Sequence, residues 1–227
     1  GVVQDAYFRM SELAEGRTFI LATPDGLVDG AGNQFWNATD ACCGEGVEKS
    51  DDVAYLAALV RQVQLKHRID RKRVYLVGHS NGGFMAHRMA CDRAGLVAGI
   101  VSLAGAQWKE PSRCQPGEPV SVLQVHGDLD ERVAYGGEPL HPSALETVTA
   151  WARLDGCTAA TAPASAGADL DLVPSLAGAE TAREAFGGCP EGVGVELWTI
   201  RAGSHVPSFN ATWGPKVYDW LQAHARR

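Results

Sequence analysis

Short apolar runs alternate along the chain with longer segments in which apolar residues recur at helical spacing. We predict strands at 19–22, 74–77, 96–103, 120–125 and 195–200, because these stretches are short and mostly apolar. We predict helices from a cap at Ser50 or Asp51 to 63, from 81 to 93, from a cap at Ser143 to 154, and around 217–221. This repeated order predicts one α/β domain over residues 1–227, with a mainly parallel sheet covered by helices on both faces.

Two stretches between these elements have the composition of turns and loops. Pro24-Asp25-Gly26 ends the first predicted strand in a turn. The segment from Thr158 to Gly178 is rich in Ala, Ser, Gly and Pro, which predicts a long surface loop. A loop of this length is unusual inside a compact domain, so we expect it to be tethered.

Six cysteines are present: Cys42, Cys43, Cys91, Cys114, Cys157 and Cys189. An even number suits three disulfides and an oxidising compartment, whereas no spacing gives the paired C-x-x-C of structural zinc sites. Reduced thiols are the alternative. We expect Cys157 to pair with Cys189 across the Ala-rich loop, and Cys42 and Cys43 to pair with Cys91 and Cys114.

Composition and charge exclude several classes of protein. Hydrophobic residues make up 45% and charged residues 21%, as in globular proteins. The net charge of −7 and the pI of about 5.5 disfavour a nucleic-acid binder. No apolar stretch approaches the roughly 18–20 residues of a membrane span, so we expect no membrane partner. The first residues show neither a basic n-region nor an apolar h-region, so we expect any signal peptide to have been removed.

The candidate nucleophile is Ser80, in Gly78-His79-Ser80-Asn81-Gly82. A G-x-S-x-G match is weak alone, but this one directly follows a predicted strand and precedes a predicted helix, the setting of the nucleophile elbow of α/β-hydrolases. The glycines two positions either side of Ser80 are expected to relieve clashes in this sharp turn. The Asn81 backbone N–H is then placed to bind a developing oxyanion. The alternative is an ordinary Gly-Ser turn.

A serine nucleophile needs a base, and the base needs an orienting acid, which follow in the chain order Ser, Asp or Glu, His. Asp128 and Asp130 follow the 120–125 strand, and His205 lies in a loop after the 195–200 strand. The spacing therefore predicts Ser80, either aspartate, and His205 as a triad.

Further residues are candidates for substrate contact. These are Trp36, His79, Trp108 and Val206, which lie beside the predicted site or at the edge of the sheet where α/β proteins bind ligands. Packing is an equally good interpretation of both tryptophans. His79 and His126 are interpreted as packed, hydrogen-bonded neighbours rather than as a second base.

Several stretches resemble one family. They are Pro24-Asp25-Gly26, the Phe-Trp-Asn-Ala-Thr-Asp-Ala-Cys-Cys stretch at 35–43, the elbow with Gly83, and His126-Gly127 with Asp130. Together they resemble secreted polyhydroxybutyrate depolymerase-like esterases, which group with the feruloyl and acetyl xylan esterases of carbohydrate esterase family 1. The resemblance implies an α/β-hydrolase fold, no metal or other cofactor, and esters of extracellular polymers as substrates. It assigns the acid to Asp130 rather than Asp128, and the base to His205.

One part of the family's sheet has no counterpart in the chain. The resemblance makes Gly1 the tail of a His-Gly loop that supplies a second oxyanion N–H, and residues 2–15 the helix that follows. The strand before that loop would lie between the predicted strands at 19–22 and 74–77. An empty place there would leave backbone groups unpaired on both neighbours. We therefore expect the 227 residues to be an N-terminally truncated esterase domain; alternatively, another segment or chain fills the place.

These observations predict a secreted serine carboxylester hydrolase that works through an acyl-enzyme on polymer-linked hydroxyalkanoate, feruloyl or acetyl esters. An acyltransferase on the same fold is the alternative among enzymes. A non-catalytic or truncated polymer-binding relative is the alternative in another class.

Overall fold

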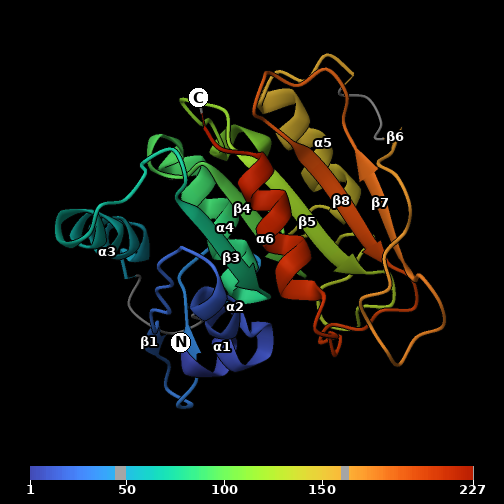
Figure 1. The fold of residues 1–227 in the computed structure, drawn as a ribbon, viewed down its shortest axis with the longest axis horizontal. Helices are drawn as coiled ribbons and strands as arrows, with labels where there is room; N and C mark the ends of the chain where they lie inside the picture. Colours follow the sequence, from blue (N-terminus) through green and yellow to red (C-terminus); the bar gives the residue numbers. More distant parts are fainter. Residues whose placement is uncertain (44–49, 160–163, 227) are drawn as a thin grey trace.

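A six-stranded sheet forms the centre of the computed structural model, which describes residues 1–43, 50–159 and 164–226. The strands lie in the order β3 (Tyr75–His79), β4 (Gly99–Leu103), β5 (Ser121–Gly127), β8 (Val195–Ile200), β7 (Thr181–Ala185) and β6 (Ala164–Ser165). The first four are parallel, and β7 and β6 extend the sheet by antiparallel pairing. The predicted α/β class and mainly parallel sheet are confirmed (Figure 1).

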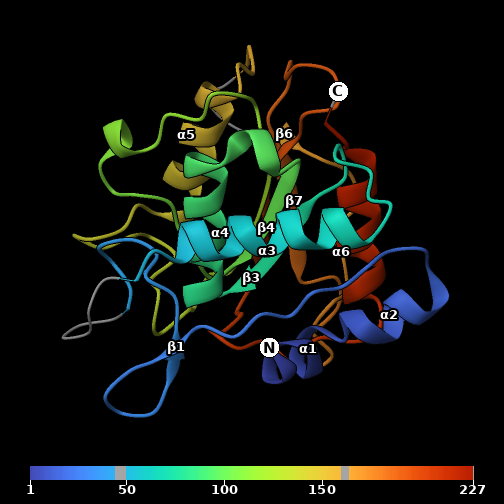
Figure 2. The same ribbon diagram turned by 90° about the vertical axis from the view of Figure 1, so that its left-hand side faces the viewer.

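Helices cover both faces of this sheet, as predicted. Figure 2 shows α4 (Asn81–Asp92) and α5 (Ala144–Leu154) on one side and α6 (Trp213–Ala223) on the other. Alternate residues of β5 explain this arrangement: Val122 packs in the cluster that contains α4 and α5, whereas Leu123 and Val125 pack in the cluster that contains α6. The sheet is therefore buried on both faces.

The remaining elements surround the β3 end of the sheet. The helix predicted for residues 2–15 is two short helices, α1 (Val2–Phe8) and α2 (Met10–Gly16), because Arg9 between them has a positive φ of 55°. A small hairpin, β1 (Leu27–Val28) with β2 (Gln34–Phe35), and α3 (Asp52–Lys66) follow. Two 3₁₀ turns are also present, Ala94–Leu96 and Pro111–Arg113. None of the described helices is long and apolar enough to cross a bilayer.

Local sequence determines where two long helices begin. The Asp51 side chain accepts a hydrogen bond from Ala54 N at 2.9 Å, so Asp51 rather than Ser50 caps α3. At α5, Ser143 and Glu146 form a reciprocal capping box. The predicted caps are thus confirmed at both helices.

The disulfides agree with the prediction in one case of three. Cys157 pairs with Cys189, as expected. The expected pairing of Cys42 and Cys43 with Cys91 and Cys114 is wrong: Cys91 bonds to Cys114, and Cys42 bonds to its neighbour Cys43. Cys91 at the end of α4 and Cys114 after the second 3₁₀ turn are buried in the same apolar cluster, with Cα atoms 5.0 Å apart.

The segment predicted as a surface loop after Cys157 is partly buried. Residues 160–163 lie outside the described residues, but β6 follows them and pairs with β7. Leu172 and Val173 are buried in the cluster under α6, and both backbone N–H groups donate to the Glu180 carboxylate at 3.1 Å. This segment therefore extends the sheet and contributes to the core.

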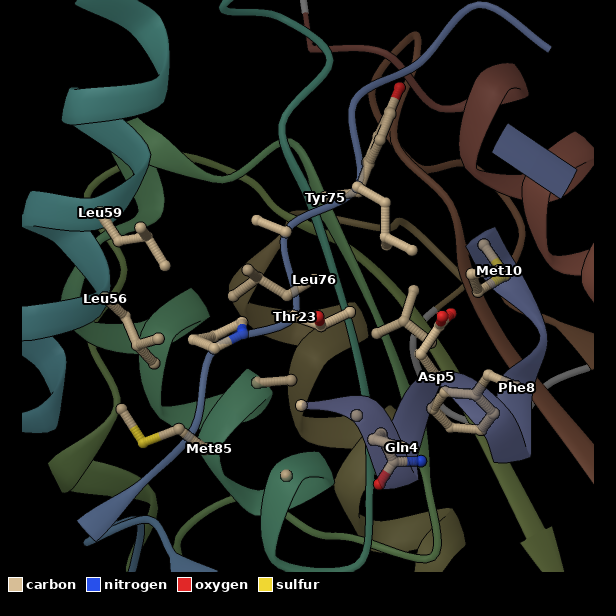
Figure 3. Close-up of a pocket in the computed structure, with 18 of the residues that line it drawn as sticks. Gln4, Asp5, Phe8, Met10, Thr23, Leu56, Leu59, Tyr75, Leu76 and Met85 are labelled. Atoms are coloured by element: carbon tan, nitrogen blue, oxygen red, sulfur yellow. The ribbon is translucent and has the colours of Figure 1, made fainter. Parts of the chain in front are cut away.

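The predicted strand at 19–22 is wrong, because this segment is extended but pairs with no strand in the described structure. It runs beside β3, which is the terminal strand of the sheet, and a cavity of about 1490 Å³ lies along β3. Figure 3 shows Thr23 near Leu76 and Tyr75 of β3, with Leu56 and Leu59 of α3 on one side and Phe8 and Met10 on the other. We call this cavity the β3 groove. Direct pairing of the 19–22 segment with β3, which would have contradicted the expected additional strand, is not found.

Candidate active site

Ser80 lies in a sharp turn between β3 and α4. Its backbone is at φ 54° and ψ −121°, a strained conformation for a residue with a side chain, and its N–H donates to Leu103 O at 2.8 Å. A side chain at Gly78 would overlap the Gly82 carbonyl, so the first glycine is required.

The clash expected at the second glycine of the motif, Gly82, is not found. A Cβ at Gly82 would meet no atom within 4 Å, apart from the backbone of its own helix. The close approach occurs at Gly83, where a Cβ would lie 2.8 Å from Ser102 Oγ on β4. Gly83 therefore allows the start of α4 to pack tightly against β4, close to Ser80.

Asp130 follows β5 and is held by several donors. Its Oδ1 accepts the backbone N–H groups of Arg132 and Val133, each at 2.8 Å. Burial raises the pKa of this carboxyl, but hydrogen bonds from His126, His205 and these two N–H groups outweigh it and hold the pKa far below its usual range. Asp130 is therefore an ionised hydrogen-bond acceptor.

Asp128, the other aspartate considered, is exposed and turned to a different partner. Its Oδ1 accepts the Ala202 N–H, which fastens the loop after β8 to the loop after β5. The structure thus brings Asp130, and not Asp128, to His205.

His205 lies in the loop after β8 and joins the other two residues. Its Nδ1 is 2.8 Å from Asp130 Oδ2 and 3.0 Å from Oδ1, and its Nε2 is 2.9 Å from Ser80 Oγ. The His205 side chain is buried, and its backbone N–H donates to Glu131 Oε2 at 3.1 Å. Because β3, β5 and β8 are parallel, their carboxyl ends bring all three side chains to the same edge of the sheet.

Asn81 begins α4 directly after Ser80, and its backbone and side chain have different surroundings. Its backbone N–H is in the first helical turn, where N–H groups have no partner within the helix and the helix dipole favours negative charge. Its side chain accepts from Trp36 N at 2.6 Å and donates to Trp36 O at 2.8 Å. This amide therefore fixes the 35–43 stretch against the elbow.

The four residues expected to contact substrate are found in different surroundings. Trp36 and His79 line the β3 groove together with Ser80, and Val206 is 53% exposed beside His205. Trp108 is buried, and the Arg113 guanidinium lies 3.6 Å from the centre of its ring. The ring face of Trp108 is therefore covered by an arginine.

Two side chains contact the loop that carries His205: His79, which was expected to be a hydrogen-bonded neighbour, and Tyr7, which was not predicted to lie there. His79 Nε2 lies 2.8 Å from His205 O, and burial lowers the pKa of His79. Tyr7 OH donates to Pro207 O at 2.8 Å, and its ring lies 5.2 Å from that of His79. The position of His79 next to Ser80 is a signal for the first contact; nothing in the sequence around Tyr7 points to the second.

Within the described ranges, no group of three or more His, Cys, Asp or Glu side chains converges as a metal site would.

The fold and the Ser80–His205–Asp130 arrangement define an α/β-hydrolase. The sequence profile of the Phospholipase/Carboxylesterase family matches residues 35–161, more than half of the chain, and the chain belongs to this family.

Individual relatives confirm the resemblance to feruloyl esterases. Feruloyl esterase B of Piromyces equi is 28% identical over 82% of this chain and 33% of its own length. Feruloyl esterase D of Neurospora crassa is 27% identical over 89% of this chain and 59% of its own length. The fold of acetyl xylan esterase from Aspergillus awamori is similar, with a TM-score of 0.58 at 15% identity over 84% of this chain and 73% of that one. The chain spans about a third to three fifths of the length of these two curated relatives.

Proposed function

We propose that this protein is a serine carboxylester hydrolase that works through an acyl-enzyme. Ser80 Oγ attacks the ester carbonyl while His205 Nε2 takes its proton. His205 then returns the proton to the departing alcohol, and water hydrolyses the acyl-enzyme by the same path in reverse. Asp130 holds His205 in the tautomer with the proton on Nδ1, and the Asn81 N–H binds the oxyanion.

The observation that carries the proposal is the continuous hydrogen-bond path from Ser80 Oγ through His205 to Asp130, with distances of 2.9 and 2.8 Å. The nucleophile, the base and the orienting acid are thus within hydrogen-bond reach without any movement of the chain. The ionised state of Asp130 also supports this role, because only a carboxylate stabilises the imidazolium that forms during proton transfer.

We further propose that the substrates are esters attached to a polymer, and that the protein acts outside the cytoplasm. The names of the feruloyl esterase relatives support an ester with an aromatic feruloyl acyl group. Disulfides Cys91–Cys114 and Cys157–Cys189 support an oxidising compartment. Trp36, which lines the β3 groove with Ser80, and Val206, which is exposed beside His205, are candidate contacts for the ester.

An additional β-strand in the β3 groove is part of the same proposal. Val74 O and Ser80 N both form hydrogen bonds toward β4. Because the backbone groups of successive residues in a strand point to opposite sides, those of Tyr75, Val77 and His79 point toward the groove. Gly1 lies at the rim of the groove, where its amino group pairs with Asp25. We propose that a strand joined to Gly1 in a longer form of this chain pairs with β3, and that its loop supplies the second oxyanion N–H.

The first experiment is intact mass after exposure to a fluorophosphonate, for the wild type and for Ser80→Ala. A single adduct on the wild type that is absent from Ser80→Ala supports an activated serine, and a panel of feruloyl, acetyl and hydroxyalkanoate esters then defines the substrate. A folded wild type without an adduct would refute the activity of residues 1–227.

The additional strand is tested by comparing residues 1–227 with a chain extended ahead of Gly1. We expect slower amide exchange at Tyr75 and Val77 and faster phosphonylation of Ser80 in the extended chain. Unchanged exchange at these amides would contradict the additional strand.

A further inference from the structure

A line of buried polar side chains leads from α5 to the catalytic acid. Trp151 Nε1 donates to His87 Nδ1 at 3.0 Å, and His87 Nε2 lies 2.9 Å from Gln124 Oε1. Gln124 Nε2 lies 3.2 Å from His126 Nδ1, and His126 Nε2 lies 3.3 Å from Asp130 Oδ2. We call Trp151, His87, Gln124 and His126 the buried polar chain. None of its members is more than 1% exposed.

The direction of the hydrogen bonds follows from the donor at one end. An indole N–H can only donate, so His87 Nδ1 must accept and the proton of neutral His87 must be on Nε2. Burial lowers the pKa of His87 to about 4, so the ring is neutral at ordinary pH. His87 therefore donates to Gln124 Oε1.

The orientation of the Gln124 amide determines which nitrogen of His126 accepts a hydrogen bond. Its Nε2 also donates to Gly105 O at 2.7 Å, which fixes the orientation of the amide because an oxygen there would face another acceptor. The second Nε2 proton points to His126 Nδ1, which must accept it. The proton of His126 is then on Nε2, and a second proton on Nδ1 would face the Gln124 donor.

His126 Nε2–H is directed at Asp130 and at the turn that holds it. Its nearer acceptor is Val133 O at 2.9 Å, and the Val133 N–H in turn donates to Asp130 Oδ1 at 2.8 Å. One N–H group thus fastens the 130–133 turn and contacts the carboxylate that this turn carries.

We propose that the buried polar chain holds the proton of His126 on Nε2, directed at the 130–133 turn, and so positions Asp130 as a carboxylate against His205. The inference rests on the proposed function, because Asp130 matters to turnover only if His205 is the base. Trp151, His87, Gln124 and His126 are positioning residues, since none of them touches Ser80 or the reacting atoms.

The groups around Asp130 and His205 determine how loss of the His126 Nε2–H donor affects this pair. Asp130 faces His126 and His205, and His205 faces His79 at a ring distance of 4.9 Å and Glu131 through its backbone N–H. Tyr135 packs edge-on against the His126 ring and bonds to Thr199. Without the His126 donor, the negative charge on Asp130 is less compensated, which favours protonated His205.

The variants His126→Phe and His126→Gln test this role. Phe fills the space without a donor, whereas Gln can place an N–H near the position of Nε2. We expect His126→Phe to lower kcat about 10- to 100-fold with little change in KM, since a hydrogen bond to a charged group is lost. The acid limb of the pH profile of kcat/KM should move to higher pH by about half a unit to one unit. His126→Gln should restore part of both.

His141 offers a matched control, because it is also buried but its ring nitrogens contact Pro142 O and Glu138 rather than a member of the buried polar chain. His141→Gln should leave the pH profile unchanged. A merely structural role for His126 would lower activity equally at all pH values, so an unshifted acid limb in His126→Phe would overturn the proposal.

Imidazole ¹⁵N NMR of the wild type tests the same proposal without turnover. We expect the Nε2–H tautomer of His126. A proton on Nδ1 would overturn the proposal even if His126→Phe does not fold. An absent fluorophosphonate adduct with the expected tautomer would instead refute the proposed function alone.

Discussion

Backbone strain at a single residue accompanies the proposed nucleophile. Ser80 has the positive φ and negative ψ that glycine tolerates and that cost other residues on the order of 1–3 kcal/mol. Ser80→Gly and Ser80→Ala both remove the hydroxyl, but only glycine relieves the strain. We expect both variants to be inactive and Ser80→Gly to have a free energy of unfolding about 1 kcal/mol higher than Ser80→Ala, measured by urea denaturation. Equal stabilities would show that the turn is not strained.

The two aspartates after β5 allow a paired test of the proposed acid. Asp130→Asn places an amide donor against the His205 Nδ1 proton, so we expect kcat to fall by about 10³–10⁴ with the fold intact. Asp128→Asn keeps an oxygen that can accept the Ala202 N–H, and should retain activity within a few-fold. Circular dichroism checks the fold of both variants, and an active Asp130→Asn would contradict the assignment.

Residue types and spacing predicted which residues meet at the site, but not what holds them. Strand ends and the Ser–Asp–His order placed Ser80, either Asp128 or Asp130, and His205 at one sheet edge, because the carboxyl ends of parallel strands meet there, and the family resemblance then favoured Asp130. The sequence predicted His126 to be a packed, hydrogen-bonded neighbour but not the path that reaches it from Trp151, because that path joins α5, α4 and β5, which are distant in the chain. Nor could spacing reveal that Gly83, rather than Gly82, makes the close contact with β4.

At the scale of elements, the junction between α5 and β5 contains a buried acid. Asp155 follows the C-terminus of α5, where the helix dipole disfavours negative charge, and accepts the Val120 N–H at 3.0 Å. Its other oxygen has no hydrogen-bond partner among the described residues, and burial raises the pKa of Asp155 to about 7.

This acid should make stability depend on pH. Between about pH 4 and pH 7, Asp155 holds a proton in the folded protein but loses it in the unfolded chain. The folded state then binds more protons, so the contribution of Asp155 to the free energy of unfolding falls as pH rises through this window and stays low above it. Asp155→Asn should leave stability at pH 4 nearly unchanged and raise it at pH 8 by on the order of 2–4 kcal/mol. Thermal unfolding at both pH values measures this; an equal change at both would contradict the assignment.

Elements were predictable where a strong pattern coincided with a cap or a buried run. The strands β3, β5 and β8 and the helices α3, α4 and α5 have such patterns, and the structure has them close to the predicted positions. β7 reads Thr-Ala-Arg-Glu-Ala and shows no apolar run, since its pairing with β8 rather than its own composition makes it a strand. The apolar run at 19–22 has the composition of a strand but pairs with no strand among the described residues.

At the scale of the whole molecule, the two edges of the six-stranded sheet differ. The sheet is finished on one side by the very short strand β6, which offers little backbone to another chain. On the other side β3 ends the sheet inside the fold, beside an apolar groove that reaches Ser80. The proposed chemistry and the unpaired edge therefore meet at the same strand.

The open edge of β3 has a consequence for how the protein behaves at high concentration. Unpaired peptide groups beside apolar walls are a template for strands of other molecules. We expect residues 1–227 to self-associate reversibly, with a sedimentation coefficient that rises with protein concentration. The phosphonylation rate of Ser80 should fall with concentration, because a strand from another molecule would lie next to Ser80 without bringing the loop that supplies the second oxyanion N–H. A monomer at all concentrations would show that the groove is closed to other chains. If association occurs, the working concentration itself becomes a regulator of catalysis, and assays of this chain must be compared at matched dilution.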